Sequence, residues 1–315
     1  MKGFGAELPV EIARDIYWIG SERVDRGLSC NPYLVKDGGR GVLIDPGSVL
    51  DFRTVLKKAL KLLPLKKIDY IILHHQDPDL CSAVPLFEKK GFRGTIATHW
   101  RTSLLVHYYG TASPFYLVDE HGFELKLPGG RALGFVPAPY LHFPGAVMTY
   151  DRETGTLFSG DLFGAFGHES RLWADDRYEE AMKSFHEQYM PSADALRPVM
   201  ELLSEMKISL IAPQHGSLIR EDPGRYISLL RDLNCGGLLA PVHRGLVERG
   251  NYSALVDQVL ARYYSLYPRD MVFETFEHSA VALDPVSGTL SGGHGAGAGL
   301  WNAFFDTVST RRGRE

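Results

Sequence analysis

The fold is decided by the stretch HHQDPDL at residues 74–80, which follows the apolar run IDYIIL at residues 68–73. A run of this composition predicts a buried strand, and α/β proteins place their chemistry in the loops at the carboxyl ends of such strands. If this loop is extended, His75, Asp77 and Asp79 point to the same side, because successive side chains alternate. One imidazole and two carboxylates that converge in this way favour a metal ion, since few other partners offset the repulsion between gathered like charges.

Three further polar residues follow apolar, strand-like segments later in the chain. They are His142 within PYLHFP at 139–144, Asp161 within LFSGDLFG at 157–164, and His215 within IAPQHG at 211–216. Taken singly, each of them is more often a cap or turn residue. The repeated order of strand, loop and potential ligand instead favours one metal site, assembled from the ends of several strands.

Together these motifs resemble the metallo-β-lactamase fold, and more narrowly the diiron domain of flavodiiron proteins and of the related oxygen-binding diiron proteins. The resemblance covers roughly residues 10–235 and implies an α/β fold, a four-layered αββα sandwich. Zinc hydrolases of that superfamily carry His-x-His-x-Asp-His, whereas here Asp77 stands for the second histidine and Leu80 for the last. Replacing nitrogen by oxygen ligands shifts the preference from zinc to iron or manganese. The resemblance to flavodiiron proteins implies that the cofactor is a pair of iron ions.

The resemblance also implies how the ligands divide between the two iron ions. One iron would be held by His75, Asp77 and His142 and the other by Asp79 and His215, with Asp161 and an oxo or hydroxo group bridging them.

Two residues next to these ligands are expected to shape the site without ligating. Leu80 stands where flavodiiron sequences often carry a histidine. Leucine cannot ligate, so the second iron is expected either to have an open position for water, dioxygen or another small ligand, or to be weakly held. His74 neighbours His75, and an extended backbone would point it to the opposite face. A supporting or structural role is therefore expected for His74.

Aromatic residues cluster around the ligand motifs, and Phe143, Phe163 and Tyr189 are expected to form an apolar wall that favours uncharged diatomic ligands. Each of them is also compatible with an ordinary position in the core. His168 and His186 lie near the motifs in the sequence, and for both a surface position is favoured over the pocket.

The composition is that of an ordinary soluble globular protein, with 44% hydrophobic and 23% charged residues and a net charge of -4. The sequence contains no Lys/Arg cluster of the kind that tracks nucleic acid, and no apolar run of the ~18 residues that a membrane span needs. No signal-peptide core is recognisable at the amino terminus, so a cytoplasmic location is expected. Three cysteines without a Cys-x-x-Cys pattern argue against a disulfide framework.

A boundary is expected at residues 234–237, between the diiron domain that the resemblance implies, at 1–235, and an α+β appendage of unknown role at 236–315. In the first, strands are expected at 15–20, 31–36, 41–45, 68–73, 94–98, 131–141, 146–150, 155–158 and 208–212, and helices at 51–63, 83–90, 175–190, 192–206 and 223–233. In the second, a helix is expected at 253–266 and a strand at 271–282. The glycine-rich stretch at 291–299 is interpreted as a loop rather than a phosphate cradle, because it lacks the flanking strand and helix of a nucleotide site.

The predicted function is that of a diiron protein that binds or reduces dioxygen, or nitric oxide. It would act as an oxygen sensor or carrier, or as a reductase with a separate redox partner protein. Residues 237–315 are too few for a doubly wound flavodoxin domain, so this chain is expected to bind no flavin. A homodimer is expected from the resemblance. The alternatives are a metal-dependent hydrolase of the same fold and a non-catalytic interaction protein with a vestigial site.

Overall fold

The computed structural model describes residues 8–21, 28, 30–166, 171–236, 252–291 and 298–312. The chain divides into two compact units, Met1–Cys235 and Gly236–Glu315. His168 and most of the glycine-rich stretch at 291–299 lie outside the described residues.

A seven-stranded sheet forms one half of the first unit, and its strands lie in the order of the sequence. They are β1 (Val10–Ala13), β2 (Ile16–Trp18), β3 (Tyr33–Asp37), β4 (Arg40–Ile44), β5 (Ile68–Ile72), β6 (Thr95–Thr98) and β7 (Phe115–Leu117). Strands β1 to β4 pair antiparallel, and β4 to β7 pair parallel. The helices that accompany this sheet are α1 (Phe52–Leu62), α2 (Pro78–Cys81), α3 (Val84–Lys89) and α4 (Trp100–Val106), with short 3-10 turns at Leu65–Lys67, His107–Tyr109 and Val118–His121.

A five-stranded sheet forms the other half. Its order is β12 (Leu210–Ala212), β11 (Thr156–Phe158), β10 (Val147–Asp151), β9 (Ala132–Pro137) and β8 (Glu124–Lys126). Only the β11–β12 pair is parallel. The helices of this half are α5 (Tyr178–Tyr189), α6 (Ala193–Ser204) and α7 (Pro223–Arg231).

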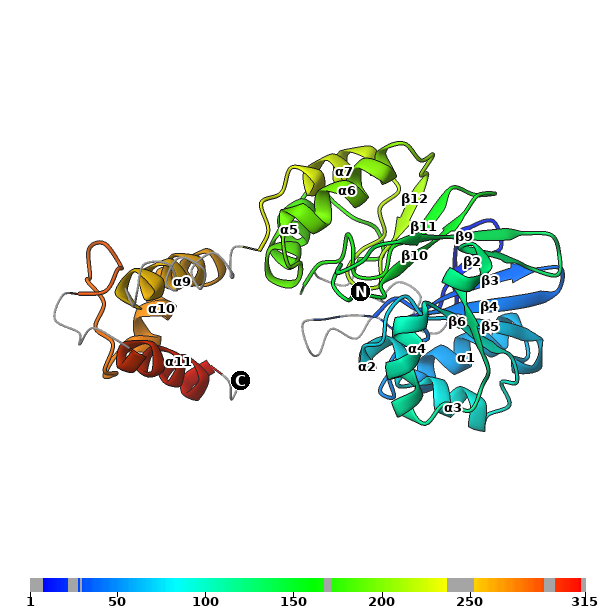
Figure 1. The fold of residues 1–315 in the computed structure, drawn as a ribbon, viewed down its shortest axis with the longest axis horizontal. Helices are drawn as coiled ribbons and strands as arrows, with labels where there is room; N and C mark the ends of the chain where they lie inside the picture. Colours follow the sequence, from blue (N-terminus) through cyan, green and yellow to red (C-terminus); the bar gives the residue numbers. More distant parts are fainter. Residues whose placement is uncertain are drawn as a thin grey trace. The chain divides into compact units, whose positions relative to one another are not determined.

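Apolar side chains fill three spaces between these layers. One buried cluster joins the two sheets, where the rings of Tyr33 and Phe158 meet with centroids 5.2 Å apart. A second lies between the seven-stranded sheet and helices α1 and α3, and a third between the five-stranded sheet and helices α5 to α7. Figure 1 shows the resulting helix–sheet–sheet–helix order. The predicted αββα sandwich is confirmed.

Strand direction brings the loops that carry chemistry to one edge of the sandwich. Because β11 and β12 are parallel neighbours, the residues that follow Phe158 and Ala212 leave the sheet at the same edge. The β9–β10 loop lies at that edge too, since β10 is antiparallel to β11. A backbone hydrogen bond from Val147 to His74 ties the loop after β5 to this edge.

The second unit contains the helices α9 (Tyr252–Leu266), α10 (Arg269–Phe276) and α11 (Ala298–Arg312). They share a small core that includes Val256, Val272, Phe276 and Phe304. The strand predicted at 271–282 is wrong, because residues 271–276 belong to α10. Val272 and Phe276 are four residues apart, and this spacing also places them on one face of a helix.

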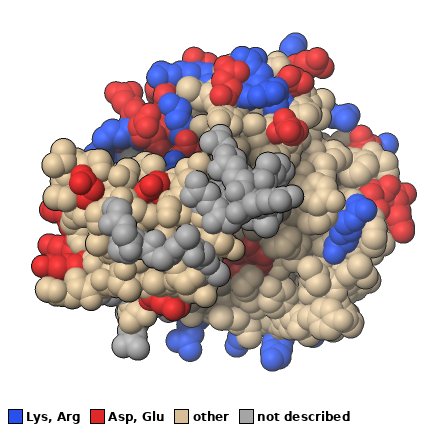
Figure 2. Space-filling model, turned by 60° about the vertical axis from the view of Figure 1, so that its left-hand side comes forward, with Lys and Arg blue, Asp and Glu red and all other residues tan. Residues whose placement is uncertain are grey.

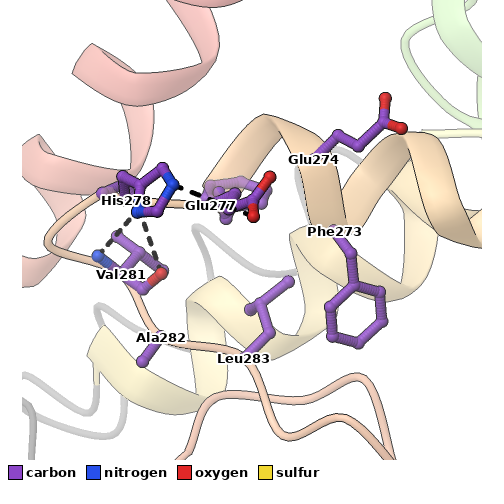
Figure 3. Close-up of a pocket in the computed structure, with 9 residues that line it drawn as sticks. Phe273, Glu274, Glu277, His278, Val281, Ala282 and Leu283 are labelled. Atoms are coloured by element: carbon purple, nitrogen blue, oxygen red, sulfur yellow. Dashed lines mark hydrogen bonds and ion pairs between the residues drawn. The ribbon is translucent and has the colours of Figure 1, made fainter.

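A pocket of about 430 Å³ opens in this second unit beside the end of α10. Figure 3 shows its lining, which comes from α10 and the segment that follows it, between Phe273 and Leu283.

Acidic and basic side chains are intermingled on the face drawn in Figure 2. Of the helices that the structure describes, none combines the length and hydrophobicity of a membrane span.

Candidate metal centre

The candidate ligands form two groups at the shared edge of the sandwich. The first consists of His75, Asp77 and His142, whose ligand atoms all lie within 4.8 Å of one another. Asp77 Oδ2 is 3.8 Å from His75 Nε2 and 3.4 Å from His142 Nε2. Two imidazoles and a carboxylate thus face one point.

The second group consists of Cys30, Asp79 and His215, whose ligand atoms also lie within 4.8 Å of one another. Asp79 Oδ2 is 3.3 Å from His215 Nε2 and 3.6 Å from Cys30 Sγ. The same oxygen accepts a hydrogen bond of 2.8 Å from Gln214 Nε2, which fixes the orientation of the carboxylate. Partners that orient a ligand in this way are typical of metal sites.

Asp161 lies between the two groups. Its Oδ1 is 3.6 Å from His75 Nε2 and 3.5 Å from His215 Nε2, and its Oδ2 is 2.8 Å from His142 Nε2. The side chain is only 2% exposed. One carboxylate therefore faces imidazoles of both groups.

His75, Asp77 and Asp79 were expected to converge because the loop after β5 would be extended. For Asp79 this expectation is wrong. Pro78 begins helix α2, and Asp77 is the extended residue just before it, with φ -67° and ψ 150°. Proline fits the first helical position because it has no N–H to satisfy there. Asp79 consequently lies in the first turn of α2 and meets His215, while Asp77 meets His142. The helix distributes the two carboxylates between the two groups.

Two glycines make room for the loops after β11 and β12. Gly160 and Gly216 have φ values of +57° and +78°, which glycine adopts without a steric penalty. A Cβ on Gly216 would also lie 2.5 Å from Tyr178 Oη. The residues beside Asp161 and His215 are therefore tightly constrained.

The pKa values of Asp161 and His142 are shifted because carboxylates and imidazoles lie close together at this buried site. Burial raises the pKa of Asp161, but the imidazoles of His75, His142 and His215 outweigh it and hold the pKa well below its usual range. Burial lowers the pKa of His142, but the Asp161 and Asp77 carboxylates outweigh it and raise the pKa to about 9. The Asp161 carboxylate and the His142 imidazole thus stabilise each other's charged forms.

The residues present fit a pair of metal ions. Asp161 Oδ1 and His142 Nε2 are buried and form no hydrogen bond of suitable geometry, although each lies close to other potential ligands. Buried polar atoms without a partner are rare in proteins and call for an explanation such as an ion. A donor set of imidazoles and carboxylates suits iron.

His74 and Leu80, which neighbour the candidate ligands in sequence, contact other parts of the fold. His74 Nδ1 pairs with the Asp45 carboxylate and its Nε2 lies 2.9 Å from Thr149 Oγ1, so both ring nitrogens are occupied away from the two groups. Leu80 is fully buried in the apolar cluster beside α1 and α3.

Aromatic rings line the first group. The ring of Phe143 lies 4.4 Å from that of His142 and 5.9 Å from that of His75, and the ring of Tyr189 lies 5.6 Å from that of His142. Phe163 is fully buried in the cluster between the sheet and α5 to α7.

His186 is not at the surface, and that expectation is wrong. It is fully buried on α5, where Nε2 accepts a hydrogen bond of 3.0 Å from the Phe163 N–H and Nδ1 donates one of 2.8 Å to the Met182 carbonyl. Burial lowers its pKa to about 4. His186 thus supports the loop that carries Asp161 as a neutral imidazole.

The residue of this centre that motif analysis missed is Cys30. It belongs to no spaced motif and lies on the amino-terminal side of β3, which begins at Tyr33. Strand β3 runs antiparallel to β4, so its beginning lies at the edge where β4 and β5 end. Cys30 could have been found from the sequence as a potential ligand placed just before a strand that runs antiparallel to the next one.

Similarity to known proteins agrees with this fold. A flavodiiron protein from Giardia intestinalis superposes with a TM-score of 0.64 at 26% identity and covers 70% of this chain and 57% of its own. The apo state of the chemotaxis sensor ODP from T. denticola superposes with a TM-score of 0.64 at 28% identity and covers 72% of this chain and 94% of its own.

Among curated proteins, an anaerobic nitric oxide reductase flavorubredoxin from Aeromonas hydrophila is 26% identical over 243 residues, which are 70% of this chain and 48% of that protein. The chain spans about half the length of the curated relatives it matches. The resemblance seen in the motifs is confirmed. Residues 28–216, more than half of the chain, match the model described as ODP family beta lactamase, and the chain belongs to that family.

Proposed function

We propose that this chain is a diiron protein that binds dioxygen or nitric oxide. The observation that carries the proposal is the position of Asp161, whose carboxylate faces imidazoles on both sides at 2.8–3.6 Å. A carboxylate with this geometry can bridge two metal ions. The relatives named above are an anaerobic nitric oxide reductase, a flavodiiron protein and the chemotaxis sensor ODP, for which a peroxy diiron species is also known; they support this function rather than the hydrolase alternative.

In this proposal each group holds one iron. His75, Asp77 and His142 would hold the first and Asp79 and His215 the second, and Asp161, which lies between the groups, would be shared by both. Two bound iron ions would supply a pair of electrons and exchangeable positions for a small ligand. Gln214 keeps the Asp79 carboxylate oriented through its 2.8 Å hydrogen bond.

The protein side chains around the first group favour small, uncharged ligands. The rings of Phe143 and Tyr189 lie against His142 and give this group apolar surface beside its imidazole. His74, held by Asp45 and Thr149, fixes the backbone from which His75 extends.

An oxygen sensor or carrier and a reductase with a separate redox partner both agree with this site. The match to the chemotaxis sensor ODP covers 94% of that chain, and the matches to the flavorubredoxins cover about half of theirs. Reducing dioxygen to water takes four electrons and an iron pair supplies two, so turnover would depend on a separate redox partner.

Iron content and oxygen reactivity test the proposal together. Protein purified from iron-supplemented cells should contain two irons per chain, and its anaerobically reduced form should change its absorption spectrum when dioxygen or nitric oxide is added. A protein that is fully loaded with iron but spectrally indifferent to both gases would refute the function.

The bridging role is tested by Asp161→Asn, which keeps the volume and removes the charge. Iron should fall to well below one per chain, because both ions lose a ligand. Asp151→Asn is the matched control, since Asp151 is also a buried carboxylate but lies at the end of β10 beside Arg131, outside both groups. Retention of one full iron by Asp161→Asn would show that the carboxylate is not shared.

A further inference from the structure

We propose that Cys30 supplies a thiolate ligand to the second metal position, beside Asp79 and His215. The proposal deepens the diiron function and rests on it for the presence of a metal pair. It replaces the open position expected from Leu80 with a ligand from a different part of the chain.

The first argument is geometric. Cys30 Sγ lies 3.6 Å from Asp79 Oδ2, and the ligand atoms of Cys30, Asp79 and His215 are mutually within 4.8 Å. Asp161 Oδ1 is buried, has no hydrogen-bond partner and points at the same group, 3.5 Å from His215 Nε2. One sulfur, one nitrogen and two oxygens therefore surround the second position.

The second argument is that the chain beside Cys30 is fastened to the loop that carries His215. The Asn31 backbone N–H donates to the Gln214 carbonyl at 2.7 Å. The Asn31 Nδ2 donates to the carbonyls of Pro213 at 3.0 Å and Gly216 at 2.8 Å. These bonds flank His215 on both sides. The thiol and the imidazole are thus positioned by one hydrogen-bonded unit.

That unit is itself anchored in the fold. Trp18 Nε1 donates to Asn31 Oδ1 at 2.8 Å, and the Tyr33 hydroxyl donates to the Pro213 carbonyl at 2.6 Å. Asn31 and Tyr33 are buried. The position of Cys30 therefore does not depend on a solvent-exposed loop contact.

The third argument compares the three thiols. Cys81 and Cys235 are buried within apolar clusters, where a free thiol behaves as a small hydrophobic side chain. Cys30 is only partly buried and faces a carboxylate and an imidazole. Thiolates bind iron and cobalt well, and a metal ion deprotonates a coordinating thiol. The second position should therefore differ from the first in its ligand chemistry.

Cobalt(II) added to the metal-free full chain, without oxygen, is the probe. A cobalt ion bound by a thiolate shows a strong near-ultraviolet charge-transfer absorption that imidazole and carboxylate ligands do not produce. The wild-type chain should bind two cobalt ions, and this absorption should appear with one of them. Cys30→Ser should lose the absorption and bind that ion about tenfold or more weakly, while still binding the other ion.

Cys235→Ala is the matched control, because it removes a buried thiol outside both groups and should retain the absorption and both ions. Binding of one cobalt ion by Cys30→Ser also demonstrates that the variant is folded. Two bound ions without the absorption in the wild type, or an unchanged absorption in Cys30→Ser, would overturn the proposal.

The outcome separates this proposal from the proposed function. If Cys30 does not ligate but two irons bind and react with dioxygen, only the thiolate assignment fails. If the thiolate absorption is present but the iron-loaded, reduced chain is indifferent to dioxygen and nitric oxide, the function fails and the ligand assignment holds. If the chain binds no metal at either group, both fail.

Discussion

At the scale of single residues, His186 shows how the centre depends on groups that do not ligate. Its neutral ring bridges the Phe163 N–H and the Met182 carbonyl, and so ties α5 to the loop after Asp161. Protonation of His186 would put an N–H donor on Nε2, facing the Phe163 N–H donor inside the buried core. Such an arrangement costs both a hydrogen bond and the burial of a charge.

This predicts an acid-sensitive contribution to stability. The pKa of His186 is about 4 in the folded chain and 6.5 for an ordinary histidine, so the unfolded chain binds more protons between these values. The contribution of His186 is fully present above pH 6.5 and is lost as the pH falls towards 4. From pH 7 to pH 5, the metal-free wild type should lose about 2 kcal/mol more stability than His186→Gln, as measured by urea unfolding.

The control is His107→Gln, which removes an exposed histidine of the same unit. Its pH dependence should equal that of the wild type. Equal pH dependence in His186→Gln and the wild type would mean that His186 does not stay neutral on folding.

At the scale of elements, the centre is made by where strands begin and end. Residues after β5, β11 and β12 and in the β9–β10 loop supply the candidate ligands that strand order predicts. Helix α2 then separates Asp77 from Asp79, because it starts at the proline between them. The start of β3 adds Cys30 from the opposite chain direction.

The hydrogen bonds of the Asn31 side chain connect the segment before β3 to the loop after β12, and their loss can be tested. Asn31→Ala removes two donors from the Pro213 and Gly216 carbonyls and leaves the Trp18 indole N–H without its acceptor. Buried groups left unsatisfied in this way cost about 1–3 kcal/mol each. We expect the variant to lose at least about 2 kcal/mol in urea unfolding, and to bind the second cobalt ion more weakly than the first.

Asn234→Ala is the comparison, since Asn234 is exposed near the end of the same unit. It should leave both the stability and the affinity for cobalt unchanged. If Asn31→Ala lowers the affinity for both cobalt ions equally, residues 30–33 have no specific role at the second metal position.

At the scale of the whole molecule, the two units have separate cores. The first unit contains the candidate metal centre and three buried clusters, and the second contains a small helical core. A unit with its own core can fold alone. Residues 1–235 expressed alone should therefore bind two irons and unfold in one cooperative transition, as judged by elemental analysis and circular dichroism. Loss of iron from this fragment would show that the second unit contributes to the centre.

A second prediction concerns the electron supply. The sequence contains no dinucleotide fingerprint, so the purified chain should not consume dioxygen steadily with NADH alone. The same preparation, chemically reduced, should respond once to added dioxygen in an oxygen-electrode and absorption experiment. Sustained NADH-driven consumption without an added partner protein would contradict the dependence on an external donor.

The sequence by itself predicted six residues suited to hold metal, and its resemblance to the metallo-β-lactamase fold predicted the sandwich that the structure has. Buried strands have local signatures, and the polar residues after them stand out against apolar runs, as at His75 and His215. The direction of parallel strands then predicts that such residues share an edge. This inference needs only short stretches of chain and the rules of strand connection.

The tertiary structure decided what depends on contacts between distant segments. Cys30 has no local signature, and its closeness to Asp79 follows only from the antiparallel entry of β3. The burial of His186 comes from the packing of α5 on the loop after Asp161, and residues 271–276 form a helix because their apolar side chains meet α11 and α9. A local pattern states which side chains are apolar or polar, but only long-range packing fixes what each of them meets.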